Sequence, residues 1–412
     1  MPATLGHDVL TPDRVRDPYP YFAEMRELEP VHWNEHHRAW FVYRFDDVIA
    51  ALKDTARFSS DRVWPAFKRL DQVQQRERAS TYDILGNWMV FQDPPSHTRL
   101  RKLVAREFTP RAIERWRPRV EAVVNELIET VVSQREDLDL IRDFAYPLPS
   151  TVIAEMLSIP LSDRDLFKGW SDDMMVLVFG ARGLADRHKR AQDGMLEMSE
   201  YMHRLVERLR KDPDESLISG LIAAQEEDED LLTDDEIVAN SMLFLFGGHE
   251  TTTNLIGNSF RSLLEHPEAL ERVRADRTQL KPAIEELLRY DGPSKTEVRI
   301  ATTDIELGGR TIREGDMVYL VQGSANRDPE VFANPDVLSF ERGSTGHIGF
   351  GFGVHHCIGA SLARLESTVA LDALLTHVHD AESAGTEEWV PTMISRGMET
   401  FPISYRFEMG SR

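Results

Sequence analysis

The feature that most restricts how this chain can fold is a glycine-rich stretch around its single cysteine, Cys357. Glycines at positions 349, 351, 353 and 359 allow the backbone to turn tightly and to approach a flat ligand without a clash from a Cβ atom. An apolar run of helical period follows from about Ile358 to His377, so the cysteine directly precedes a predicted helix. Because the dipole and free N–H groups of a helix start stabilise a thiolate, the stretch predicts a thiolate ligand with a lowered thiol pKa.

Three other interpretations of this stretch differ in strength. A phosphate-binding loop requires the pattern Gly-x-Gly-x-x-Gly, and His356 stands where the third glycine is needed. A zinc site would crowd three ligands into the consecutive residues His355, His356 and Cys357, with no second cluster to complete it. A buried structural cysteine in a glycine-rich turn stays open as the alternative.

Helical periodicity dominates the rest of the chain, and shorter β-like segments interrupt it. The clearest predicted helices are Ile113–Val132, Asp193–Arg210, Thr233–Leu264 and Lys281–Tyr290. A hairpin is predicted at Val31–Trp33 and Ala39–Tyr43, and short strands at Val298–Ala301, Ile305–Leu307, Thr311–Ile312 and Val318–Val321. Asp46 and Ser96 are the predicted N-caps of two further helices. With no repeat, linker or alternating βαβ pattern, residues 1–412 are expected to form a single, mainly α domain with small β-sheets.

Composition narrows the function classes. The net charge of −22 argues against a general role in holding nucleic acid or an anionic membrane. The N-terminus lacks the basic start and apolar run of a signal peptide, and no apolar stretch is long enough to span a bilayer. A cytoplasmic protein is therefore expected, and its one cysteine excludes an intramolecular disulfide.

The cysteine stretch resembles the signature of the cytochromes P-450, Phe-x-x-Gly-x-x-x-Cys-x-Gly, and every fixed position is filled from Phe350 to Gly359. The resemblance implies a haem-thiolate monooxygenase that carries haem b (iron protoporphyrin IX) between a long central helix and the helix after the cysteine. Cys357 is then the iron ligand, whose thiolate favours cleavage of the O–O bond. Further haem contacts implied in this stretch are Phe350 beside the sulfur, His355 on a propionate, Gly351, Ile358 and Gly359.

Glu286 and Arg289 stand three residues apart and can form an ion pair on one helix face. Most such pairs are solvated surface features of little energy. The family carries a Glu-x-x-Arg motif about seventy residues before its cysteine, and this pair has that place. The resemblance implies a buried, structural pair with Arg342 as its third member.

Two adjacent glycines, Gly247 and Gly248, lie inside the long predicted helix Thr233–Leu264. Each costs helix stability of about 1 kcal/mol relative to alanine. They therefore indicate close approach of a ligand or a local widening of the helix. Thr251 can donate its hydroxyl to the carbonyl of residue 247, which would help to open the helix there.

The run from Gly247 to Thr251 resembles the family's oxygen-binding motif, Gly-Gly-x-Asp/Glu-Thr. The resemblance implies that Glu250 and Thr251 are catalytic and relay protons for cleavage of the O–O bond, and that Gly247 faces the haem. A zinc-protease motif is excluded, because position 253 is Thr253 where a histidine is required. A threonine cluster with a capping or core role stays the alternative.

Four cationic or hydrogen-bonding residues match places where the family holds the haem propionates. His97 and Arg101 stand four residues apart and project from one helix face. Two buried carboxylates need such partners, because unpaired buried charge is expensive. The resemblance implies His97, Arg101, Arg299 and His355 as these partners, and Phe108 at the edge of the macrocycle. Ordinary surface charge is the alternative for each of them.

Substrate contacts follow from the resemblance alone. The expected pocket is mainly apolar, so a small, mainly hydrophobic organic molecule is the predicted substrate alongside dioxygen. Its predicted contacts are Met89, Met242, Phe246, Lys295, Val298 and Met398.

The chain is too short to add a flavin domain and has no cysteine set for an iron–sulfur cluster. Electrons are therefore expected from a separate ferredoxin-type donor with its reductase. The expected docking patch is basic and comprises Arg99, Lys102, Arg106, Arg111 and Arg364. Without long heptad repeats, a monomer is expected.

Two further functions stay open at this point. A peroxide-driven haem-thiolate enzyme is disfavoured by the intact Glu250–Thr251 pair, since peroxide users need no proton relay for dioxygen. A haem protein that only binds gas or transfers electrons is disfavoured by the same acid–alcohol pair and by an apolar substrate pocket.

Overall fold

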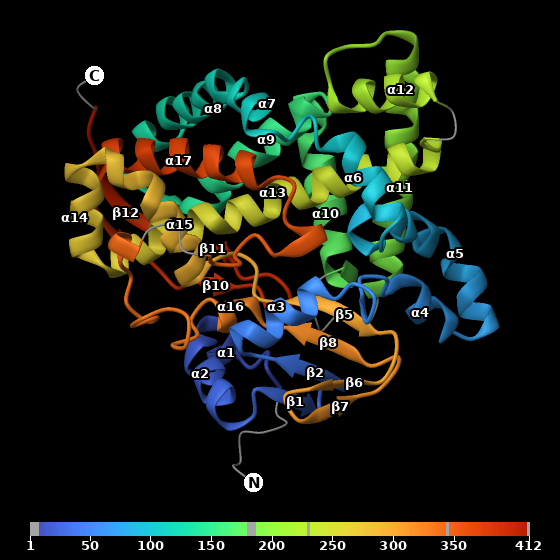
Figure 1. The fold of residues 1–412 in the computed structure, drawn as a ribbon. Coiled ribbons are helices and arrows are strands. Elements are labelled where there is room, and N and C mark those ends of the chain that lie inside the picture. The colour runs from blue at the N-terminus through green and yellow to red at the C-terminus, as the bar shows by residue number, and fades with distance from the viewer. Residues whose placement is uncertain (1–7, 179–186, 229–230, 343–345, 410–412) are drawn as a thin grey trace.

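The computed structural model describes residues 8–178, 187–228, 231–342 and 346–409. Helices predominate and short strands form small sheets, which confirms the predicted fold class. In Figure 1 most helices fill the upper part of the molecule, and the largest sheet lies at the bottom beside α1 (Pro12–Arg16) and α2 (Tyr19–Leu28). Within these ranges, the structure contains no helix that is both long and apolar enough to cross a membrane.

The longest described helix, α13 (Asp234–Glu265), runs through the middle of the helical part (Figure 1). It begins with a capping box, in which the Glu236 N–H donates to Thr233 Oγ1 and the Thr233 N–H donates to the Glu236 carboxylate. Helices α9 (Pro147–Met156), α11 (Arg187–Lys211) and α17 (Ala360–His377) pack against it, and α13 is therefore buried on several sides.

The remaining α-helices lie around α13 and beside the sheets. They are α3 (Phe45–Lys53), α4 (Val63–Lys68), α5 (Gln72–Gly86), α6 (Ser96–Val104), α7 (Pro110–Glu114), α8 (Arg117–Thr130), α10 (Arg164–Val178), α12 (Leu217–Glu227), α14 (Pro267–Ala275), α15 (Leu280–Asp291) and α16 (Gln322–Ala325). A π-helical segment, η3 (Leu140–Ala145), also contacts α13.

The largest sheet has the strand order β1-β2-β8-β5-β3. Strands β2 and β8 pair in parallel, and the other three pairs of neighbouring strands in this sheet are antiparallel. Its strands are β1 (Val31–Asn34), β2 (Ala39–Val42), β3 (Phe58–Ser59), β5 (Glu297–Ala301) and β8 (Met317–Leu320). The smaller sheets contain β4 (Asp137–Asp139), β6 (Ile305–Leu307), β7 (Arg310–Ile312), β9 (Val378–Ser383), β10 (Glu388–Trp389), β11 (Met398–Thr400) and β12 (Pro402–Phe407).

The observed elements agree with the predicted ones except at four places. The predicted helix Asp193–Arg210 is the later part of the longer α11, which begins at Arg187. The predicted helix Ile113–Val132 is two helices, α7 and α8, and Pro118 stands in the first turn of α8. Asp46 and Ser96 are not caps: each lies inside the first turn of its helix, and the N-cap positions belong to Arg44 and Pro95.

The predicted Glu286–Arg289 pair is buried below α17, as expected. Arg289 Nε and Nη2 each donate to the Glu286 carboxylate at 2.8 Å, and Arg342 Nε donates at 3.3 Å. Arg289 also donates to the carbonyls of Asn326 and Pro335, so the pair joins α15 to the chain that leads into the cysteine stretch. Its buried charges are therefore paired and hydrogen-bonded.

Candidate active site

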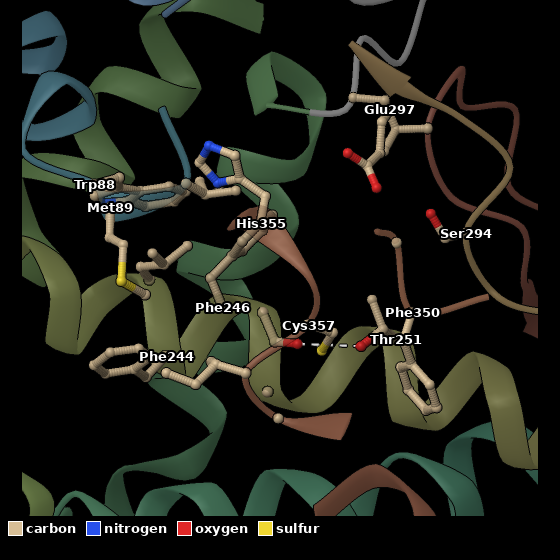
Figure 2. Close-up of a pocket in the computed structure, with 18 of the residues that line it drawn as sticks. Trp88, Met89, Phe244, Phe246, Thr251, Ser294, Glu297, Phe350, His355 and Cys357 are labelled. Carbon is tan, nitrogen blue, oxygen red and sulfur yellow. Dashed lines mark hydrogen bonds between the residues drawn. The ribbon is translucent and has the colours of Figure 1, made fainter. Parts of the chain in front are cut away.

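A cavity of about 360 Å³ lies between α13 and the cysteine loop, defined here as residues 349–359. Its walls come from α13, α6, β5, the cysteine loop and the turn η1 (Met89–Phe91), so segments far apart in the sequence meet there. Figure 2 shows Cys357, Thr251, Phe246 and His355 around this space. Most lining side chains are apolar, which suits a flat hydrophobic cofactor and an apolar substrate.

Every residue predicted to contact the haem lines this one cavity. These residues are His97, Arg101, Phe108, Gly247, Arg299, Phe350, Gly351, His355, Cys357, Ile358 and Gly359.

The Cys357 side chain opens into the cavity, and its backbone N–H donates to the Phe350 carbonyl at 2.8 Å. Gly353 turns the loop with a φ of +75°, and a Cβ there would lie 3.0 Å from the Leu52 carbonyl oxygen. The expected lowering of the thiol pKa is wrong for the protein alone: burial raises the pKa of Cys357, and the Gly359 N–H and Arg101 only oppose that rise. A cation placed beside the sulfur would favour the thiolate.

The polar end of the cavity fits carboxylates. Both ring nitrogens of His97 are buried and have no hydrogen-bond partner among the described residues. The His97 and His355 rings lie 4.1 Å apart, and His355 Nε2 is 2.9 Å from Ser60 Oγ. Burial, helped by neighbouring arginines, lowers the pKa of His97 to about 4 and that of His355 to about 2. A buried imidazole without a partner is costly, so this end fits added acceptors such as haem propionates.

Arg101 and Arg299, at the polar end of the cavity, each donate a hydrogen bond to another residue of the protein. Arg299 Nη2 donates to Glu297 at 2.6 Å, and Arg101 Nη2 donates to the His356 carbonyl at 2.5 Å. Both guanidinium groups also line the cavity, so they can turn to a carboxylate placed there.

The adjacent glycines Gly247 and Gly248 of α13 have different surroundings. A Cβ on Gly248 would lie 2.8 Å from Ile153 Cγ1, so this glycine allows α9 to pack closely. A Cβ on Gly247 would contact nothing within 4 Å, because this residue faces the cavity. Thr251 Oγ1 donates to the Gly247 carbonyl at 3.2 Å, as predicted, and Thr251 lines the cavity.

Glu250 does not line the cavity. Its carboxyl lies inside the protein beside Ser395 and Asn254, and Oε2 is enclosed without a hydrogen-bond partner among the described residues. Burial raises the pKa of Glu250 to about 8, although contacts with Ser395 and Asn254 lower it in part. The carboxyl therefore holds a proton at neutral pH.

The predicted substrate contacts divide into two groups. Met89, Phe246 and Val298 line the cavity. Met242, Lys295 and Met398 do not line it, and that part of the prediction is wrong. Lys295 Nζ turns away and donates to the Thr392 carbonyl at 2.6 Å, beside a second, much smaller cavity. Met242 and Met398 are buried in the hydrophobic core.

Two residues that line the cavity, Trp88 and Arg62, and one buried acid near it, Glu366, carry no recognisable sequence signal. Trp88 is fully buried and stacks on Phe91 with ring centroids 5.8 Å apart. Arg62 lines the cavity from the segment before α4. Glu366 of α17 is fully buried near Thr252, both its carboxylate oxygens lack a partner among the described residues, and burial raises its pKa well above the usual range.

Comparison with known proteins agrees with this site. The sequence model of the cytochrome P-450 family matches residues 31–379. The chain is 39% identical to the cytochrome P-450 monooxygenase PikC of Streptomyces venezuelae, over 98% of this chain and 95% of that protein. It is 36% identical to the vitamin D(3) 25-hydroxylase of Pseudonocardia autotrophica, over 97% of each protein. The testosterone complex of CYP109E1 from Bacillus megaterium has a TM-score of 0.87 and 34% identity, covering 96% of this chain and 99% of that one.

The family match spans most of the chain and includes the cysteine loop and the glycine pair of α13. The relatives are similar to this chain over nearly their whole length. The chain therefore belongs to the cytochrome P-450 family and is a haem-dependent monooxygenase that oxidises a small organic substrate with dioxygen.

Proposed function

We propose that Cys357 ligates the iron of haem b in the cavity, and that His97, Arg101, Arg299 and His355 hold the haem propionates. The observation that carries this proposal is one cavity with a thiol in its wall and unpaired His97 nitrogens at its polar end. When bound, the haem activates dioxygen, of which one atom enters the substrate and the other leaves as water.

The residues at the polar end have distinct tasks. Arg101 and Arg299 supply two positive charges for two propionates, and His97 and His355, being neutral, each donate one N–H. Phe108, Phe350 and Ile358 contribute apolar contacts to the macrocycle, while Gly247, Gly351 and Gly359 leave room for it.

The proton supply rests on Thr251 and Glu250. The Thr251 hydroxyl lies at the cavity wall, where it can pass a proton toward the reacting oxygen. Glu250, the next residue back, is protonated at neutral pH because burial raises its pKa to about 8. It therefore acts as the proton reservoir behind Thr251, outside the substrate space.

Electrons come from a separate ferredoxin-type donor with its reductase. Of the predicted docking charges, Arg99 is paired with Glu236 and Arg364 with Glu285, which leaves Lys102, Arg106 and Arg111 exposed and without an ion pair among the described residues. We define these three as the basic patch. A cytoplasmic location, a single haem domain and a monomer stay predictions from the sequence.

The direct test is the absorption spectrum of the dithionite-reduced protein before and after carbon monoxide. The parent is expected to show a Soret band far to the red of histidine-ligated haem, and Cys357→Ala is expected to lose it. Cys357→Ser, which keeps the size of the side chain, is the matched control for folding. No haem, or a histidine-type band in the freshly purified parent, would contradict the proposal.

A second assay separates the monooxygenase from a peroxide-driven enzyme. Product is expected with the electron donor and dioxygen, and this yield is expected to fall in Thr251→Ala because proton delivery fails. Turnover with peroxide alone and none with reductant would contradict the role of Thr251 and Glu250.

A further inference from the structure

One cation in the cavity wall has no part in the roles above. Arg62 lies directly before α4, and its guanidinium is held in place by two contacts. Nη2 donates to the Val178 carbonyl at the end of α10 at 3.0 Å, and Cζ lies 4.7 Å from the centroid of the Phe91 ring. These contacts fix the guanidinium without neutralising its charge.

No carboxylate forms an ion pair with Arg62 within the part of the chain that the structure describes. Burial lowers the pKa of Arg62 to about 10, and the charge of Arg299 contributes to this, so the group is still cationic at neutral pH. Nε and Nη1 donate to none of the described residues. These unused N–H groups can therefore bind an anion that enters the cavity.

The haem itself does not use this charge. Two propionates would carry two negative charges, and Arg101 and Arg299 lie at the polar end to pair with them, although Arg299 is also paired with Glu297. His97 and His355 are neutral there, since their pKa values are lowered to about 4 and about 2. Arg62 is thus a third guanidinium in the wall of a mainly apolar cavity, and it has no carboxylate of its own among the described residues.

An aromatic wall leads from Arg62 to α13. The Phe91 ring that faces Arg62 stacks on Trp88 with centroids 5.8 Å apart, and Trp88 lies 5.7 Å from Phe246, one residue before Gly247. Figure 2 shows Trp88 and Phe246 on the side of the cavity that α13 forms. A molecule anchored at Arg62 can therefore lay an apolar body along this wall toward Thr251.

We infer that Arg62 binds the carboxylate of the substrate, and that the substrate is an organic acid whose apolar body is oxidised at a carbon remote from the acid group. This inference rests on the proposed function. The unused N–H groups of the guanidinium can donate to the oxygens of a carboxylate.

The test is a spin-state titration of the haem-loaded protein with matched pairs of acids and methyl esters. The pairs share linear, aromatic or fused-ring bodies, for example dodecanoic acid and methyl dodecanoate. The best-bound acid is expected to bind about ten- to a hundredfold more tightly than its ester, because a charge-assisted hydrogen bond is lost in the ester. Arg62→Gln is expected to abolish this preference and Arg62→Lys to keep part of it.

Arg76→Gln, which removes one exposed arginine from α5, controls for the loss of net charge and is expected to keep the preference. Equal binding of acid and ester in every pair, or no binding of any acid, would overturn the inference.

A haem propionate could also supply a carboxylate to Arg62, and the experiments above would then give a different result. If Arg62 held a propionate, Arg62→Gln would shift the reduction potential of the substrate-free protein and leave the acid preference unchanged, which would also overturn the inference. The carbon monoxide spectrum of Arg62→Gln keeps the two proposals apart, since a red-shifted band there supports the thiolate ligand whatever the acid preference.

Discussion

Burial changes the charge state of the residues around the cavity in one consistent direction, toward the neutral form. It raises the pKa of Glu250 to about 8 and that of Glu366 well above its usual range, and it lowers the pKa of His97 to about 4. The sequence identifies Glu250 and His97 by their motifs, but the pKa shifts depend on side chains brought together by the fold. Glu366 has no motif, and its burial beside Thr252 follows only from the packing of α17 on α13.

Glu250→Gln tests the charge state of this acid. The folded pKa of about 8 lies above the ordinary value of 4.5, so the folded protein binds the extra proton between these pH values. The stabilising contribution of protonation is complete below about pH 4.5 and is lost as the pH rises toward 8. Relative to the variant, the parent should therefore lose stability from pH 5 to pH 8 in urea unfolding.

The same group gives a kinetic signature. If protonated Glu250 supplies the proton, product formation by the parent falls as the pH rises through about 8. Glu250→Gln should be slower, by roughly ten- to a thousandfold, and should lack this alkaline fall. Glu126→Gln, which makes the same change at an exposed position of α8, serves as the control; a parent profile that is flat across pH 8 would contradict the proton role.

At the scale of single elements, local signals decide what the sequence predicts. The helix α13 is predicted to within one residue because Thr233 and Glu236 form a capping box and the run that follows is long and apolar. The division between α7 and α8 is missed, although Pro118 is a signal for a helix start, since proline fits the first turn of a helix. Caps at Asp46 and Ser96 fail because these residue types also occur within first turns, where acids favour the helix dipole.

The close packing of Gly248 in α13 against α9 leads to a prediction about stability. A methyl group on Gly248 would lie 2.8 Å from Ile153 Cγ1, so Gly248→Ala should force α9 and α13 apart. Gly220 of α12 has nothing within 4 Å of an added Cβ, so Gly220→Ala is the matched control and should gain up to about 1 kcal/mol. The free energy of unfolding in urea should be about 1–3 kcal/mol lower for Gly248→Ala than for this control. Equal free energies of unfolding for the two variants would contradict this prediction, because they would show that α9 can move away from α13 without loss of stability.

At the scale of the whole molecule, the sequence predicts those residues of the haem site that belong to recognisable motifs. Cys357, His355, Thr251 and Gly247 come from contiguous motifs, and the cavity brings all of them together. The substrate side is predicted poorly, because Lys295 and Met398 lie in segments near the cavity while their side chains turn elsewhere. Arg62 is missed for the converse reason: it stands in an unremarkable loop, and only the fold carries it into the cavity wall.

The distribution of charge over the whole molecule leads to the last prediction. The protein carries a net charge of −22, yet the basic patch of Lys102, Arg106 and Arg111 is exposed on α6, on α7 and in the turn between them. An acidic electron donor would be steered to this patch, so Arg106→Glu should slow the first reduction step several-fold at low salt. The effect should shrink as added salt screens the charges. Arg313→Glu makes the same change of charge near the small β6–β7 sheet at the bottom of Figure 1 and should leave the rate nearly unchanged. Stopped-flow reduction by a ferredoxin across a range of ionic strength measures both variants, and equal slowing by the two would show that net charge, not this patch, governs the encounter.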